Sequence, residues 1–210
     1  PQAEAAIVPP KTYQAAAMQA LETRSEKVPV LVGNRGLQLG NLAKMYRFAQ
    51  VVVASRLVPV GLDTPEKVLV AIQWGAELGL TPMASCRGIH VIDGMPSLSG
   101  QLALGLCWSR GAFGRVDGVL FSGDGDARVA TFRAQRKGQA SIYEAAFSVE
   151  DAKRANLIGD SRKKNWIWYP DDMLQWRAIG RWIKRYAPDV VLGLPITEEA
   201  LDYEPRERLA

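Results

Sequence analysis

Residues 170–187, near the end of the chain, combine positive charge with aromatic side chains in a helical pattern. At 100° per residue, four cations fall within about one third of the circumference of such a helix, and they are Arg177, Arg181, Lys184 and Arg185. Apolar residues such as Ile179 and Trp182 occupy the opposite side. A helix that packs through one face and carries cations on the other suits a phosphate backbone. The same pattern also fits a solvated surface helix whose last cations offset its own C-terminal dipole.

The loop before this helix places three cations directly ahead of a group of aromatic residues. The cations are Arg162, Lys163 and Lys164, and the aromatic residues are Trp166, Trp168 and Tyr169. Cations that neutralise phosphates, together with rings that stack on bases, hold single strands without reading their sequence. Trp166 is the expected stacking residue because it lies nearest to the cations. In the alternative interpretation, both tryptophans are core anchors that fix the loop, because an exposed tryptophan is costly.

Charge is spread unevenly along the 210 residues, although the net charge is only +4. Residues 128–185 contain 13 Lys or Arg against six Asp or Glu, whereas residues 186–210 contain two against six. A basic block followed by an acidic tail indicates a polyanionic partner. Three cations of the block, Arg133, Arg136 and Lys137, lie near the turn of a predicted hairpin. At that place they either reach a bound strand or face the solvent.

Residues for nucleotide or metal chemistry do not form recognisable patterns. The glycines of residues 33–40 are not followed by Gly-Lys-Ser/Thr, so we expect no P-loop. The Gly-Asp-Gly-Asp run at residues 123–126 lacks the glutamate of a calcium loop, with Gln135 at that position, and predicts a turn instead. His90 is the only histidine, which excludes most zinc sites built from histidines. We therefore expect no catalysis and no cofactor.

Cysteine usage and hydropathy indicate the compartment. Cys86 and Cys107 are far apart and have no CxxC spacing, so two buried free thiols in a reducing cytoplasm are expected. No apolar run approaches the length of a membrane span, and no signal peptide is visible. We expect a cytoplasmic protein without a membrane partner.

Periodicity predicts helices and one hairpin in the first half of the chain. Residues 1–36 are read as a flexible N-terminal arm with one helix at residues 12–23. The remaining elements are helices at residues 42–56 and 65–77, a hairpin turning at residues 93–94, and a helix that Ser97 or Ser99 caps and that ends near residue 110.

The second half predicts three strands followed by helices. The strands are residues 115–121, 127–136 and 140–147, and the helices are residues 148–156 and 170–187. Ser148 with Asp151 resembles a capping box at the start of the first of these helices. The predicted fold is α+β: N-terminal helices and a β-hairpin, a three-stranded antiparallel β-β-β-α core, then a basic helix. We expect one DNA-binding domain at residues 37–197 between the arm and an acidic tail at residues 198–210.

Several segments, in this order, resemble the RecT family of phage recombinases. They are TPEKVLVAIQWGAELGLTPM from residue 64, GIHVIDGMPSLSG from residue 88, FSVEDAKRA from residue 147, Trp166 to Tyr169-Pro170, and MLQWRA from residue 173 with Pro188-Asp189. The resemblance covers about residues 41–197. Arg177 and Lys184 stand where cations are expected in the last motif. Ala187 departs from the family, which often carries an aromatic residue before the Pro-Asp pair.

The resemblance implies an ATP-independent single-strand annealing protein of a bacterial host cell. Such proteins form rings or helical filaments, bind single-stranded DNA, and hold the nascent duplex while a complementary strand pairs. They work beside an exonuclease and contact the host single-strand-binding protein, and Mg²⁺ acts only as a modulator of annealing. Two other classes stay open: a single-stranded RNA or DNA binding module without annealing activity, and a metal-dependent nuclease.

Overall fold

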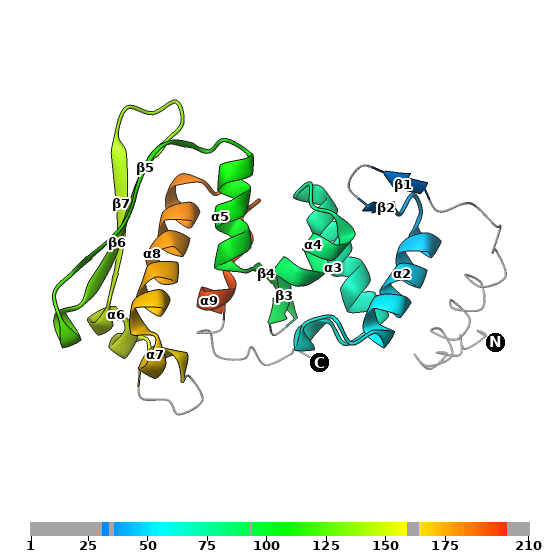
Figure 1. The fold of residues 1–210 in the computed structure, drawn as a ribbon, viewed down its shortest axis with the longest axis horizontal. Coiled ribbons are helices and arrows are strands. Elements are labelled where there is room, and N and C mark those ends of the chain that lie inside the picture. Colours follow the sequence, from blue (N-terminus) through cyan, green and yellow to red (C-terminus); the bar gives the residue numbers. More distant parts are fainter. Residues whose placement is uncertain (1–30, 34–35, 93, 159–163, 201–210) are drawn as a thin grey trace, which may run out of the picture. The chain divides into compact units, whose positions relative to one another are not determined.

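The computed structural model describes residues 31–33, 36–92, 94–158 and 164–200 (Figure 1). The chain divides into two compact units, Pro1–Phe48 and Ala49–Ala210. The described part of the first unit contains an antiparallel hairpin of β1 (Leu31–Gly33) and β2 (Gly36–Gln38), followed by the start of α2 (Leu42–Ala54). The predicted arm is thus wrong for its last residues, which form this hairpin. The helix predicted at residues 12–23 lies outside the described residues.

A three-stranded antiparallel sheet organises the second unit. It consists of β5 (Phe113–Ser122), β6 (Val129–Arg136) and β7 (Ile142–Ser148) in the order β5-β6-β7. All three strands were predicted, with ends that differ by two residues at most. The short 3-10 helix Gly125–Ala127 joins β5 to β6, and Gly138, at φ +84°, allows the tight turn between β6 and β7. The α+β class and the antiparallel β-β-β-α core are therefore confirmed.

Helix α8 (Pro170–Tyr186) lies along one face of this sheet, and α5 (Gly100–Ser109) packs beside α8 (Figure 1). Alternation along β6 turns Ala130, Phe132 and Ala134 toward the helix. Trp182 is fully buried at this contact, with its ring centroid 5.7 Å from that of Phe132. Burial of such large rings stabilises the packing of α8 against the three-stranded sheet.

Helix α6 (Val149–Arg154) follows β7 without a loop. The Ser148 side chain accepts a hydrogen bond from the Asp151 backbone N–H, and the Asp151 carboxylate accepts one from the Ser148 N–H. The predicted capping box is therefore confirmed. The expected helix ran to residue 156, but Asn156 has a φ of +52°, which ends the helical conformation.

Helices and a hairpin precede the sheet in the second unit. They are the 3-10 helix Val60–Leu62, α3 (Pro65–Glu77), α4 (Pro82–Gly88), β3 (Ile89–Ile92), β4 (Met95–Leu98) and α5. Thr64 caps α3 with a side-chain hydrogen bond, as predicted. Of the two residues predicted as the cap of α5, Ser97 and Ser99, the structure has Ser99 in this role. Helix α4 was not predicted, although Thr81 caps it and Pro82 occupies its first turn.

Two short helices fall in segments that were expected to be irregular. Helix α7 (Asn165–Trp168) lies within the predicted basic loop, and α9 (Thr197–Ala200) extends into the predicted acidic tail. The carboxylate of Glu198 accepts a hydrogen bond from the Gly100 N–H at the N-terminus of α5, with oxygen–nitrogen distances of 3.1 and 3.2 Å. Residues 198–200 are thus part of the packed fold, which corrects the predicted start of the tail.

The structure describes both cysteines and the lengths of the helices. Cys86 and Cys107 are both buried and free, as predicted. Burial raises the pKa of the Cys107 thiol to about 11, which keeps it protonated at neutral pH. In the part of the chain that the structure describes, every helix is too short or too polar to cross a membrane.

A close helix contact gives a first test of the packing. A Cβ added at Gly75 of α3 would lie 1.7 Å from Ser85 Oγ of α4, whereas one added at Gly105 of α5 meets no atom within 4 Å. We expect Gly75→Ala to destabilise the protein by about 1–3 kcal/mol through overpacking. The control, Gly105→Ala, should stabilise it by about 0.5–1 kcal/mol, because alanine favours the helix. Urea denaturation measures both, and equal stabilities of the two variants would contradict the α3–α4 contact.

Candidate nucleic-acid interface

The two tryptophans of α7 point in opposite directions. Trp166 is only 9% exposed, and its ring centroid lies 6.1 Å from that of Phe147 on β7. Trp168 is 62% exposed. The prediction that Trp166 stacks on a base is therefore wrong, because this ring is part of the core, and the alternative interpretation as an anchor holds for Trp166 alone. Trp168 is the tryptophan of this segment that a ligand can reach.

Trp168 is the centre of an exposed group that we call the Trp168 surface, formed by Lys164, Ile167, Trp168 and Tyr169. The ammonium group of Lys164 lies 5.7 Å from the centroid of the Trp168 ring, within the range of a cation–π contact. The Trp168 backbone N–H donates to the Lys164 carbonyl at 3.0 Å, so one helical turn fixes the two residues together. The predicted neighbours Arg162 and Lys163 lie outside the described residues.

Arg177, the first cation of the predicted strip on α8, is buried with 4% exposure. Its guanidinium donates to the Glu198 carbonyl at 2.7 Å and lies 5.0 Å from the centroid of the Phe147 ring. Arg177 thus joins α9 to the sheet. The prediction that it lies on an exposed cationic face is wrong, because α9 covers this side of the helix.

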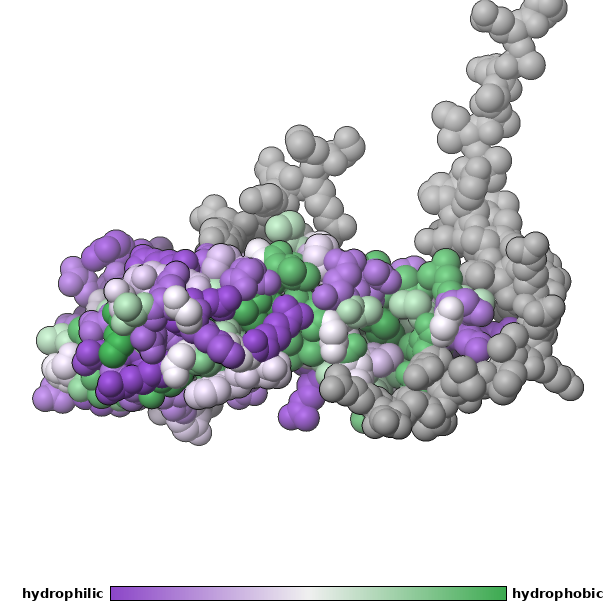
Figure 2. All heavy atoms as spheres, turned by 90° about the horizontal axis from the view of Figure 1, so that it is seen from above, coloured by the Kyte–Doolittle hydropathy of each residue, from purple (hydrophilic) through white to green (hydrophobic). Residues whose placement is uncertain are grey.

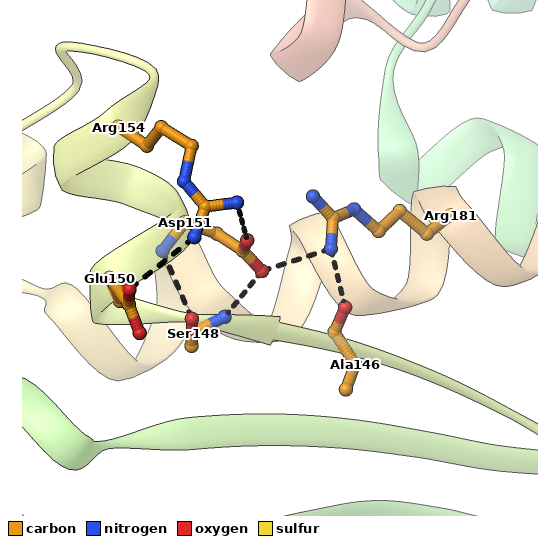
Figure 3. A network of polar contacts seen from close by, with 6 residues as sticks. All are labelled: Ala146, Ser148, Glu150, Asp151, Arg154 and Arg181. Atoms are coloured by element: carbon orange, nitrogen blue, oxygen red, sulfur yellow. Dashed lines mark hydrogen bonds and ion pairs between the residues drawn. The ribbon is translucent and has the colours of Figure 1, made fainter.

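Arg181 holds the edge strand and α6 onto α8 (Figure 3). Its guanidinium donates to the Ala146 carbonyl at 2.8 Å and to the Asp151 carboxylate at 3.0 Å. The guanidinium carbon Cζ lies 4.4 Å from the centroid of the Phe147 ring. Arg154 approaches the same carboxylate, at 3.7 Å. Arg181 therefore connects α8 to β7 and α6, and its side chain remains about one third exposed.

The Asp151 carboxylate is the acceptor at the centre of this network. Partial burial by itself would raise its pKa, but the Ser148 N–H hydrogen bond and the charge and hydrogen bond of Arg181 outweigh burial. The pKa of Asp151 consequently lies below its ordinary value. At neutral pH the carboxylate is ionised, and it ties α6 to both β7 and α8.

The last two cations of α8 lie at its exposed C-terminal end. Lys184 forms an ion pair with Glu199 of α9, with 2.6 Å between its Nζ and the carboxylate oxygen. Arg185 is exposed and forms no ion pair with a described residue. Both therefore remain candidates for phosphate contacts. To bind a phosphate, Lys184 would have to give up its ion pair with the Glu199 carboxylate.

The three cations predicted near the β6–β7 turn separate in the structure. Arg133 lies on the outer face of the sheet, 2.9 Å from Glu144, and Arg136 pairs with Asp189 at 2.7 Å. Lys137 is exposed in the turn itself and has no ion pair with a described residue. Figure 2 views the molecule from the side of this turn, and hydrophilic side chains dominate the surface over the sheet.

A recess elsewhere in the second unit has a different character. Its volume is about 610 Å³, and it is lined by Leu57, Pro59, Met83, Ala84, Cys86 and Arg87. Among the described residues that line it, Arg87 alone is charged. Within the described ranges, no three His, Cys, Asp or Glu residues are grouped so that they could hold a metal ion.

Comparison with known proteins adds no relative: no family model matches the sequence, and neither a curated protein nor a solved structure is similar to the chain. The resemblance to the RecT family accordingly stays a prediction from the sequence motifs.

The Asp151 network predicts a pH-dependent contribution to stability. We expect Asp151→Asn to lower the free energy of unfolding by about 1 kcal/mol at pH 7, because the cap and the Arg181 pair are weakened. Since the folded-state pKa of Asp151 is lowered, this contribution is complete above its unfolded pKa, about 3.9, and is lost as the pH falls through the folded pKa. The difference between wild type and variant should therefore shrink from pH 7 to pH 3.

Urea denaturation at several pH values measures this difference. Asp126→Asn is the control, because Asp126 pairs with Lys153 on the exposed surface and should matter little. A difference for Asp151→Asn that stays constant from pH 7 to pH 3 would show that its charge plays no part.

Proposed function

We propose that this chain is an ATP-independent single-strand annealing protein that binds unpaired DNA through the Trp168 surface. The observation that carries the proposal is the largely exposed Trp168 ring beside the Lys164 ammonium group. An aromatic face stacks on an unpaired base, and a cation beside it neutralises the adjoining phosphate. A double helix keeps its bases stacked inside, so this pair of groups favours a single strand.

Annealing requires few protein contacts beyond base stacking and the neutralisation of phosphates. Two complementary strands repel each other through their phosphates, and Lys or Arg side chains reduce that repulsion as they displace counterions. Stacking on one face of a base leaves its pairing edge accessible. A protein that holds one strand in this way raises the local concentration of pairing partners without covalent chemistry or nucleotide hydrolysis.

The positions of the RecT-like motifs on the fold support the proposal. The first motifs form α3 with the start of α4, and the β3–β4 hairpin with the start of α5. The later motifs form the end of β7 with α6, then α7, then α8. The residues of the resemblance therefore include both the Trp168 surface and the elements that hold it, through Phe147 and Trp166.

Assembly and partners follow from the same proposal. Subunits line up along a strand as a ring or helical filament, and many weak contacts then sum to stable binding. The protein works in the cytoplasm of a bacterial host beside an exonuclease and the host single-strand-binding protein. Residues 65–80 and the N-terminal arm are the proposed regions for subunit contacts.

Substitutions in α7 separate base stacking from core packing. We expect Trp168→Ala to weaken binding of a 20-nucleotide single strand by about 1–3 kcal/mol, because one stacked base is lost. Trp168→Phe should retain most of the affinity. Trp166→Ala should instead lower the free energy of unfolding by about 3–5 kcal/mol.

Fluorescence anisotropy of a labelled strand and urea denaturation measure the two effects. Unchanged affinity for Trp168→Ala, with stability also unchanged, would contradict the proposed binding surface.

Annealing itself is tested with two complementary oligonucleotides that carry a donor and an acceptor dye. We expect the protein to accelerate pairing without ATP, because the sequence carries no P-loop. Complexes should grow with strand length in native mass spectrometry. An equimolar mixture of non-complementary strands is the control.

The other outcomes distinguish the alternatives. Retention of strands, DNA or RNA, without faster pairing would indicate a binding module that does not anneal. Degradation of the labelled strands in the presence of Mg²⁺ would indicate a nuclease. An absolute requirement for ATP would contradict the RecT-like proposal.

A further inference from the structure

A second tryptophan, Trp108, is exposed at the end of α5 and belongs to no predicted site. Its side chain is 57% exposed. It contacts the ring of Phe113, the first residue of β5, at a centroid distance of 4.9 Å and an angle of 56°. Exposure of so much of an indole to water is unfavourable, which is typical of an aromatic side chain that contacts a ligand.

Trp108 rests on packed aromatic rings. Phe113 contacts Trp182 with 5.3 Å between ring centroids and Phe132 with 6.3 Å. Trp182 and Phe132 are both core residues. A chain of rings thus runs from the centre of the fold to the surface and holds the exposed indole in place, which lowers the entropic cost of stacking a ligand on it.

A lysine lies near the turn that follows this indole. The Lys137 backbone N–H donates to the Ala112 carbonyl at 2.8 Å, which fixes the β6–β7 turn against the α5–β5 connection. The Lys137 Nζ is 3.7 Å from the position that a Cβ at Gly111 would occupy. The Gly111 N–H in turn donates to the Trp108 carbonyl at 3.0 Å. The ammonium group therefore lies by the backbone of the turn that follows Trp108, which places a cation in the neighbourhood of the exposed indole.

We infer that Trp108 with Lys137 is a second platform for an unpaired base and its phosphate, so that one strand contacts both ends of α8. This inference rests on the proposed function and extends it. Trp168 directly precedes the start of α8, whereas Trp108 reaches the helix through Phe113 and Trp182, near its C-terminal end. The 17 residues of α8 span about 25 Å, so a strand that contacts both platforms must extend over about that distance.

The charge of the surroundings favours a nucleic acid over an apolar protein surface. Arg185 is the penultimate residue of α8, at the same end of the helix, and Lys137 is exposed in the neighbouring turn. Neither forms an ion pair with a described residue. An aromatic face with cations nearby attracts a base and its phosphate, whereas burying those cations against apolar groups would be costly.

The test uses the full chain, a 20-nucleotide oligo(dT), a 3-nucleotide oligo(dT), and a 20-unit abasic deoxyribose-phosphate chain. We expect Trp108→Ala to weaken binding of the 20-nucleotide strand about 5- to 150-fold, the range given by the loss of one stacked base. Trp108→Phe should restore most of the affinity, and binding of the abasic chain should not change. The loss should be smaller on the 3-nucleotide strand, which is too short to reach both platforms even when it is fully extended.

Two controls separate stacking from a structural role. Trp108→Leu still covers Phe113 but has no aromatic face, so we expect it to bind as weakly as Trp108→Ala while unfolding at the wild-type urea concentration. Leu120→Ala removes an exposed apolar side chain from the outer face of the sheet and should leave affinity unchanged.

Four outcomes decide the matter. Wild-type affinity for Trp108→Ala on the 20-nucleotide strand, or an equal loss on the abasic chain, would overturn the inference. Binding with the expected Trp108 effect but without annealing would support the inference and overturn the proposed annealing function. Failure of the wild-type protein to bind any of the three probes would overturn both.

Discussion

The contact between α8 and the three-stranded sheet determines where every candidate binding residue lies. Trp182 is buried between Phe113 and Phe132, and its indole N–H donates to the Tyr143 carbonyl of β7 at 3.1 Å. Arg181 donates to the Ala146 carbonyl, which the alternation along β7 turns to the free edge of the sheet. Edge strands with unpaired carbonyls invite association with other chains, and here α8 both covers the sheet and occupies one carbonyl of its edge.

This contact explains why the cations of α8 have different roles. Helical periodicity places Arg177, Arg181 and Lys184 on one side of the helix, as predicted, but periodicity does not tell what packs there. Residues 194–200 return to α8 and supply the Glu198 carbonyl and the Glu199 carboxylate. Contacts between segments this far apart in sequence depend on the whole fold, so the burial of Arg177 could not be predicted from the helix pattern.

The strands, most helices and their caps could be predicted because these features are local. The end of α6 at Arg154 and the whole of α4 were missed, since both depend on short segments with little periodicity. The exposure of the two tryptophans could not be predicted from the sequence. Their segment was expected to be a loop, and the alternative interpretation buried both of them. In the helix α7, residues two apart differ by about 200°, so Trp166 and Trp168 face different sides, and the contact with Phe147 shows that Trp166 is the buried one.

The distribution of the remaining charge bears on the proposed binding of a single strand. The cations in the middle of α8 contact carboxylates and carbonyls of their own chain, whereas three exposed candidate cations without an ion pair to a described residue, Lys164, Lys137 and Arg185, lie toward its two ends. Under the proposed function, one subunit contributes few phosphate contacts, each worth about 0.7 in the salt slope for a single strand. The proposal thus assigns much of the affinity to stacking and predicts that a single subunit binds weakly. It also predicts that many subunits side by side cover a strand, an arrangement that leaves base edges open to a second strand.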